Sequence, residues 1–82
     1  MGWVVYILEC TDGTLYTGIT NDLENRIKAH ETGRGAKYTK GRGPFRLAYT
    51  EECASRSEAS RREIQIKKLD RRAKLQITAD PV

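Results

Sequence analysis

Residues 6–30 read YILECTDGTLYTGITNDLENRIKAH and predict a β-hairpin followed by a helix. Two runs rich in apolar and β-branched residues, 3–8 and 15–20, flank the sequence Thr-Asp-Gly-Thr at positions 11–14. Asp-Gly readily adopts the positive φ of a tight connection, so we expect the two runs to pair as antiparallel strands.

Four chemically useful side chains fall within this stretch. Tyr6 and Tyr16 lie one in each predicted strand, and the predicted helix carries Arg26 and His30, the only histidine of the chain. At about 100° per residue, Arg26 and His30 lie roughly 40° apart on one helical face. We interpret the two phenols, the guanidinium and the imidazole as one site.

Capping signals and periodicity predict the next elements. Asn21 or Asp22 can cap the first helix, and Gly33 is a natural stop after it. Apolar and polar residues then alternate over 45–49, which predicts a third strand. Its apolar face is expected to hold three side chains: Phe45, Leu47 and Tyr49.

Two helices are predicted in the last third of the chain. Ser55 and Glu58 have the spacing of a capping box and open a helix that runs to about Leu69. Asp70 can cap a final short helix that ends near Thr78. The order β-β-α-β-α-α predicts an α/β or α+β domain, with one small sheet and helices packed on it.

Length and composition limit the class of protein. The 82 residues predict a single domain over 1–80 with a tail at 81–82, and a small core. The absence of any apolar run of about 20 residues argues against a membrane helix, and the start lacks the basic region of a signal peptide. Cys10 and Cys53 form no Cys-x-x-Cys motif, so we expect reduced, buried thiols and a cytoplasmic protein.

The net charge of +4 is unevenly distributed. The segment 34–46 is interrupted by glycines and has five basic residues and no acidic one: Arg34, Lys37, Lys40, Arg42 and Arg46. A flexible basic loop of this kind would bind phosphates with salt-dependent affinity. The alternative is charge that serves solubility alone. Because the loop follows His30 directly, we favour nucleic-acid binding through Lys37, Lys40 and Arg42.

Glu63 lies where an apolar side chain is expected. It shares one helical stripe with Ala59 and Ile66, and a charge on an inward stripe must be paired, bind a metal or line a cleft. The alternative is a carboxylate at the rim that bridges to Lys67 or Arg62. The pattern alone leaves both interpretations open.

These residue types suit phosphodiester hydrolysis. The reaction needs a base for the attacking water and positive charge for the developing phosphate charge, and a metal held by one carboxylate can supply much of the latter. A tyrosine is protonated at neutral pH, so it acts as a base only if a metal or a cation favours its phenolate. Without further information, tyrosines on hairpins more commonly serve cross-strand packing.

The ordered pattern resembles the GIY-YIG nuclease superfamily, and most closely its small stand-alone bacterial branch. The resemblance covers nearly the whole chain, through these parts: Val4-Val5-Tyr6, Tyr16-Thr17-Gly18, Arg26, His30, the segments 18–23 and 35–39, and Glu63 followed by Ile66-Lys67-Lys68-Leu69.

The resemblance implies a three-stranded sheet flanked by helices, with the site on its face. It makes Tyr16 the general base or the phenol that positions the water, with Tyr6 beside it. Arg26 would stabilise phosphate charge, and His30 would contact phosphate or assist proton transfer. Glu63 would be the single carboxylate ligand of one Mg²⁺ or Mn²⁺.

Two departures from the superfamily pattern bear on activity. The first motif reads Val-Val-Tyr and lacks its glycine. Many members also place an amide side chain downstream of the glutamate, where this helix offers Gln65, Lys67 and Lys68, with Gln76 further on. Lys67 shares the face of Glu63 and would hold phosphate as a diffuse charge.

The sequence thus predicts a metal-dependent endonuclease that acts on DNA, with little sequence preference of its own, in repair, recombination or defence. Branched or single-stranded DNA is the expected substrate, RNA is left open, and a larger protein partner could supply specificity. The alternative is a non-catalytic nucleic-acid-binding module with the same fold and basic loop.

Overall fold

The structure, a computed structural model, describes residues 2–35 and 39–79. Within these residues the elements follow the predicted order β-β-α-β-α-α. Their bounds are β1 Trp3–Glu9, β2 Leu15–Thr20, α1 Leu23–Glu31, β3 Arg46–Cys53, α2 Arg56–Lys67 and α3 Arg71–Ala79.

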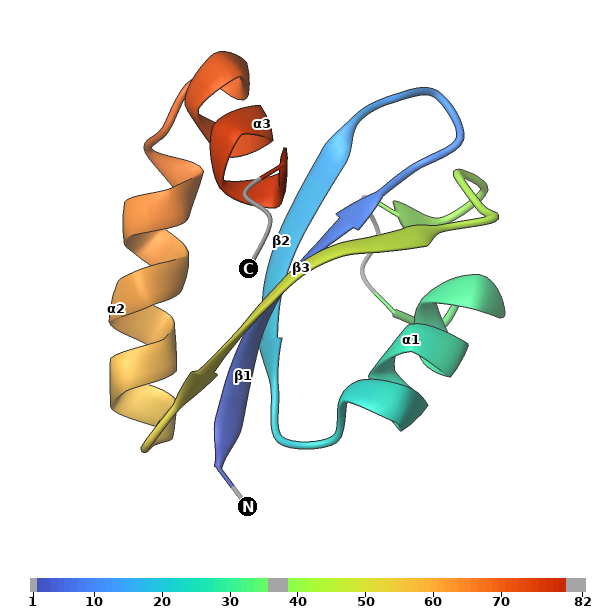
Figure 1. Ribbon diagram of the computed structural model, residues 1–82. Helices are drawn as coiled ribbons and strands as arrows, with labels where there is room; N and C mark the ends of the chain where they lie inside the picture. Colours follow the sequence, from blue (N-terminus) through green and yellow to red (C-terminus); the bar gives the residue numbers. More distant parts are fainter. Residues whose placement is uncertain (1, 36–38, 80–82) are drawn as a thin grey trace.

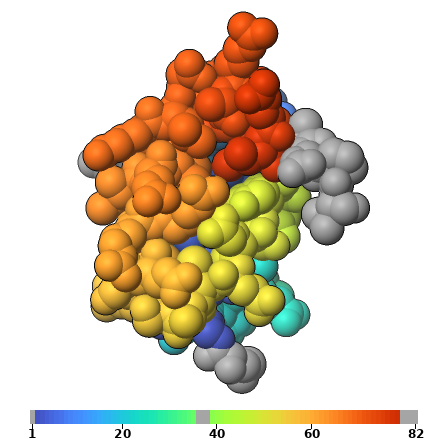
Figure 2. Space-filling model, turned by 60° about the vertical axis from the view of Figure 1, so that its left-hand side comes forward, coloured from blue at the N-terminus to red at the C-terminus, as the bar shows by residue number. Residues whose placement is uncertain are grey.

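The three strands form one antiparallel sheet in the order β2-β1-β3, with β1 in the centre. Figure 1 shows α1 on one side of this sheet and α2 with α3 on the other. Helix α2 contacts all three strands. In Figure 2, α2 and α3 (orange and red) form one surface beside the yellow residues of β3. The fold is the predicted small α+β domain, and none of its described helices is long and apolar enough to cross a membrane.

The core lies on both sides of β1. Residues 5–8 are fully buried. Val5 and Ile7 pack against Ala59 and Ile66 of α2, which confirms the predicted inward stripe of that helix. Because side chains alternate along a strand, the residues between them point to the side of α1. Both faces of the central strand are therefore occupied.

The third strand is confirmed, but its predicted alternation is wrong. Ile7 pairs with Tyr49, whereas Leu8 pairs with Leu47, so Ala48 is an extra residue between them. Such a β-bulge shifts the side-chain parity of the strand. As a result Tyr49 packs against the core, while Leu47 lies on the opposite face and is 41% exposed.

The predicted helix caps are confirmed. Asp22, Ser55 and Asp70 each accept a hydrogen bond from the amide three residues further on, at 3.3, 3.2 and 2.9 Å. These bonds satisfy amides that have no partner inside the helix. Gly33 follows α1 with φ +80°, a conformation that favours glycine.

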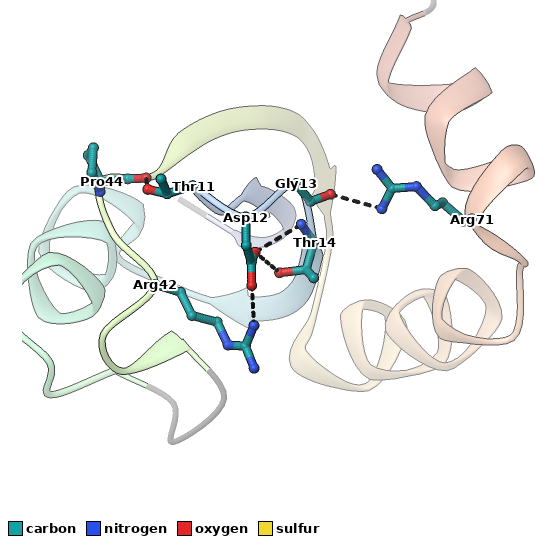
Figure 3. A network of polar contacts seen from close by, with 7 residues as sticks. All are labelled: Thr11, Asp12, Gly13, Thr14, Arg42, Pro44 and Arg71. Atoms are coloured by element: carbon teal, nitrogen blue, oxygen red, sulfur yellow. Dashed lines mark hydrogen bonds and ion pairs between the residues drawn. The ribbon is translucent and has the colours of Figure 1, made fainter.

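The loop before β3 is tied to the β1–β2 turn (Figure 3). The amide and the hydroxyl of Thr11 donate to the carbonyls of Arg42 and Pro44, both at 3.0 Å. Arg42 also forms an ion pair with Asp12. The described part of the predicted basic loop is thus fastened to the hairpin, and one of its cations is neutralised there.

Candidate active site

The hairpin places the two motif tyrosines side by side. Tyr6 pairs with Gly18, and Leu8 pairs with Tyr16. Since paired residues point to the same face, both phenols lie on the α1 side, with ring centroids 6.3 Å apart. A Cβ at Gly18 would lie 2.6 Å from Tyr6 Oη and 3.0 Å from Tyr16 Cε2. Only glycine leaves room for the two rings.

Helix α1 brings Arg26 and His30 to these rings. His30 is 1% exposed, and its Nε2 lies 2.8 Å from Tyr6 Oη. Arg26 Nε donates to the same oxygen at 3.4 Å. The ring of His30 also meets that of Tyr16 edge-on, with centroids 5.1 Å apart. The structure therefore brings together the four residues that the sequence grouped as one site.

Three residues behind His30 were not predicted to support it. Thr39 is buried, and its Oγ1 lies 2.8 Å from His30 Nδ1. The ring of Phe45 packs edge-on at a centroid distance of 6.1 Å. A Cβ at Gly35 would lie 2.8 Å from His30 Cε1. For Gly35 and Thr39 the sequence signal was the 35–39 motif, in which neither residue was given a role, and Phe45 was predicted only as a residue of the third strand.

Burial and charge set the protonation of the site. Burial raises the pKa of Tyr6, and the hydrogen bond from Arg26 only partly opposes this. Burial also lowers the pKa of His30, and the charge of Arg26 lowers it further. The hydrogen bond with Tyr6 raises the pKa of Arg26, and Tyr16 adds to this effect. At neutral pH, Tyr6 is a phenol, His30 is neutral and Arg26 is charged.

These states assign the protons along one chain of hydrogen bonds. Arg26 Nε–H donates to Tyr6 Oη, so the phenol proton of Tyr6 is directed to His30 Nε2. The proton of the imidazole then lies on Nδ1 and is donated to Thr39 Oγ1. This assignment gives each proton one acceptor and fixes the tautomer of His30.

Burial divides the site into an inner and an outer part. Tyr6 and His30 are almost completely buried, at 0% and 1% exposed. Tyr16, Arg26 and Glu63 are only partly buried, and Tyr16 lines a surface hollow of about 360 Å³. Tyr16 and Arg26 are therefore the accessible, outer members of the cluster on the α1 side, and Glu63 is a partly accessible residue of α2.

Glu63 lies on α2 between the buried Ala59 and Ile66. Its side chain is 22% exposed and its Oε2 lies 3.4 Å from Lys67 Nζ, the ion pair that the sequence offered as an alternative to metal binding. Its charge is the smallest of the effects that raise the pKa of Tyr6, and its helix lies on the side of the sheet opposite α1 (Figure 1).

A single divalent cation fits this donor set. The described residues contain no cluster of three or more histidine, cysteine, aspartate or glutamate side chains. Mg²⁺ is commonly bound by one or two carboxylates together with water and substrate phosphate. Glu63 is a partly exposed carboxylate of the required kind, so it would hold the ion once Lys67 has moved away.

The residues predicted to bind nucleic acid differ in their surroundings. Lys40 is exposed, whereas Arg42 is paired with Asp12 and Lys67 with Glu63. Lys37 lies outside the described residues.

The family model of the GIY-YIG catalytic domain matches residues 2–76. The chain belongs to the GIY-YIG family. The two tyrosines of the family name are Tyr6 and Tyr16 in this sequence, and the structure shows why the hairpin keeps them together.

The similar proteins are small members of the GIY-YIG family. The UPF0213 protein CPE1444 of Clostridium perfringens is 60% identical over 73 residues, which are 89% of this chain and 78% of that protein. The UPF0213 protein BH0048 of Halalkalibacterium halodurans is 54% identical over 79 residues, or 96% of this chain and 84% of that protein.

Solved structures share the fold. The solution NMR structure of BH0048, from Bacillus halodurans, has a TM-score of 0.61 at 55% identity and covers 94% of this chain and 82% of that one. The structure of EF2693 from E. faecalis has a TM-score of 0.62 at 41% identity, with coverage of 89% and 78%. The predicted fold and family are thus confirmed, and GIY-YIG membership indicates a nuclease that acts on nucleic acid.

Proposed function

We propose that the protein is a divalent-metal-dependent endonuclease that hydrolyses phosphodiester bonds in DNA with little sequence preference of its own. The observation that carries this proposal is the division of the site into buried residues and partly exposed ones. A buried chain of hydrogen bonds from Arg26 to Thr39 holds one guanidinium beside the partly exposed Tyr16.

The outer residues supply the chemistry. Arg26 keeps its charge at any physiological pH, and a fixed cation stabilises the negative charge that develops on a phosphate during attack. Tyr16 lies at the border of the surface hollow, where its hydroxyl orients the attacking water and accepts its proton if the phenolate is favoured by neighbouring positive charge.

The inner residues act by positioning. Tyr6 accepts the hydrogen bond of Arg26, and His30 accepts that of Tyr6. Because Tyr6 and His30 are buried, their contribution is to fix the direction of the guanidinium and to hold a proton at a defined atom. Preorganisation of this kind avoids reorganisation during the reaction.

Glu63 would hold the cation. When bound, a divalent ion supplies positive charge for the phosphate oxygens and promotes ionisation of water. Glu63 and Lys67 form an i, i+4 pair, and pairs of this kind on exposed helices contribute only about 0.3–0.5 kcal/mol. The interaction of a divalent ion with both a carboxylate and a phosphate is stronger than such a pair.

Low sequence preference follows from the kind of group present. The outer residues offer charge and hydroxyl groups, which suit phosphates. Contacts to phosphate position a nucleic acid but do not specify its sequence. Branched or single-stranded DNA, whose backbone is accessible, is the substrate we infer.

The test is a nicking assay on supercoiled plasmid and on a branched oligonucleotide, with Mg²⁺, Mn²⁺ or a chelator. Glu63→Gln is compared with Glu24→Gln, because Glu24 forms the same kind of i, i+4 pair with Lys28 on α1. We expect metal-dependent cleavage by the wild type and by Glu24→Gln, and none by Glu63→Gln.

Equal cleavage by the two variants would show that Glu63 takes no part in the reaction. Salt-sensitive binding without any cleavage by the wild type would contradict the proposed endonuclease activity. It would support the alternative, a non-catalytic nucleic-acid-binding module.

A further inference from the structure

A groove runs along β2 beside the site. One hollow, of about 360 Å³, is lined by Leu15, Tyr16, Thr17, Lys67 and Lys74. A second, of about 180 Å³, is lined by Thr14, Leu15, Arg71 and Lys74. Because the two hollows share Leu15 and Lys74, they adjoin.

The groove is formed by the edge strand of the sheet and the two C-terminal helices. Lys67 comes from α2, and Arg71 and Lys74 come from α3. At about 3.3 Å per residue, residues 14–17 of the hairpin span roughly 10 Å. That length suits a short piece of polymer backbone, and it begins at the partly exposed Tyr16.

The described lining carries positive charge only. It contains three cations and no acidic residue, and of the three only Lys67 forms an ion pair within the described residues, with Glu63 of its own helix. Lys74 has no ion-pair partner among residues 2–35 and 39–79. Arg71 Nη1 donates to the carbonyl of Gly13 at 2.8 Å (Figure 3), and a carbonyl leaves the charge of the guanidinium uncompensated. This contrasts with Arg42 on the other side of the turn, which is paired with Asp12.

Thr17 adds an independent observation. Its side chain is almost completely buried, and its Oγ1 is the one buried polar side-chain atom without a hydrogen-bond partner in the described structure. An unsatisfied buried hydroxyl costs free energy. Thr17 lines the larger hollow, so turning its hydroxyl toward a bound phosphate or its water would break no hydrogen bond.

We propose that this groove is a phosphate-binding subsite that holds the nucleic-acid backbone next to the scissile phosphate, with Lys74 and Arg71 as its cations. The proposal rests on the nuclease function proposed above and names where the substrate strand lies. The strand passes from the outer residues over Tyr16 and along β2 toward the tip of the hairpin.

The experiment measures the binding of a short fluorescent single-stranded DNA oligonucleotide in the presence of a chelator, over a range of salt concentrations. Each phosphate contact contributes about 0.7 to the slope of log affinity against log salt for single strands. We expect Lys74→Gln to weaken binding and reduce the slope by about this amount. Lys68→Gln is the matched control, because Lys68 is an exposed lysine of the same region that does not line the groove.

NMR titration of the wild type with the same oligonucleotide gives a second readout. Amide shifts at Thr17 and Lys74 support the subsite, and shifts confined to other surfaces overturn it. Equal slopes for Lys74→Gln and Lys68→Gln, or no binding by the wild type, also overturn it.

The chelator separates this result from cleavage. A reduced slope together with an inactive wild type would support the subsite and contradict the nuclease. Cleavage by the wild type with an unchanged slope in Lys74→Gln would support the nuclease and contradict the subsite.

Discussion

Tyr6 Oη lies 2.8 Å from His30 Nε2, and both side chains are buried. This bond joins the first strand to the first helix, 24 residues apart in the sequence. With Nε2 as the acceptor of the phenol proton, this bond keeps its direction only while His30 is neutral, because a protonated imidazole has no free lone pair.

Stability should therefore fall as the pH is lowered from 7.5 to 5. An unfolded histidine takes up a proton below about pH 6.5, whereas burial and Arg26 lower the pKa of His30 in the folded protein. The unfolded state then binds more protons, so the free energy of unfolding decreases through this window. Urea unfolding of the wild type and of His30→Gln measures it, and the variant should show a flatter pH dependence.

The lone histidine allows a direct check. Its ring resonances titrate without overlap from other histidines, and we expect a pKa below about 6.5. A value at or above that of an unfolded histidine would show that the ring is not held as a neutral acceptor.

Gly18→Ala should damage the site and the fold together. The added Cβ would lie 2.6 Å from Tyr6 Oη, so the phenol must shift away from His30. Overpacking of this kind costs roughly 1–3 kcal/mol, and we expect loss of cleavage as well. Gly41→Ala is the control: its φ of +77° is strained for alanine, but nothing lies within 4 Å. It should lose stability and keep its activity.

The fold was predictable because its signals are local. The Asp-Gly turn, the caps at Asp22, Ser55 and Asp70, and the stop at Gly33 each act within a few residues. The grouping of the four site residues was predictable for the same reason. The alternation of side chains in the hairpin places the two tyrosines on one face of the sheet, and the helical repeat places Arg26 and His30 on one face of α1.

The remaining features depend on contacts that a periodic pattern does not encode. Thr39 contacts His30 across nine positions of the sequence, a distance that no helical or strand period relates. The bulge at Ala48 changes the face of the residues before it. Phe45, which directly precedes β3, packs beside His30, whereas Tyr49 packs against the core. The pairing of Arg42 with Asp12 likewise requires the loop and the turn to meet.

Removing Arg26 should slow cleavage far more than it weakens the fold. Loss of one group that stabilises transition-state charge typically costs about 10²–10³ in rate, and we expect Arg26→Gln to fall in this range. The same variant should raise the pKa of His30, because the charge of Arg26 lowers it. Arg61→Gln, an exposed change on α2, serves as control. Normal turnover in Arg26→Gln would show that the guanidinium does not act on the phosphate.

Lys67→Gln should strengthen metal binding and weaken DNA binding. Lys67 Nζ lies 3.4 Å from Glu63 Oε2, so it competes with a cation for the carboxylate. An i, i+4 pair of this kind is worth about 0.3–0.5 kcal/mol, which corresponds to an increase in Mn²⁺ affinity of roughly 1.7- to 2.3-fold. Isothermal titration with Mn²⁺, in the absence of DNA, measures this. An unchanged or weaker affinity would mean that the ion does not bind at Glu63.

Arg42 and Lys40 should behave differently although both were predicted to bind nucleic acid. Arg42 pairs with Asp12. Hydrogen bonds from Thr14 are the main cause that lowers the pKa of that carboxyl, and Arg42 lowers it further. Arg42→Gln should therefore lower the melting temperature and change the salt slope of DNA binding little. Lys40 is exposed and has no ion-pair partner among the described residues, so Lys40→Gln should leave the melting temperature unchanged and reduce the slope.

The double variant distinguishes the two roles. If both residues contacted phosphate, their effects on the slope would add; if only Lys40 does, the double variant should have the slope of Lys40→Gln and the melting temperature of Arg42→Gln. A slope that falls equally in the two single variants would show that Arg42 leaves Asp12 when DNA binds, and that the turn and the loop separate in the complex.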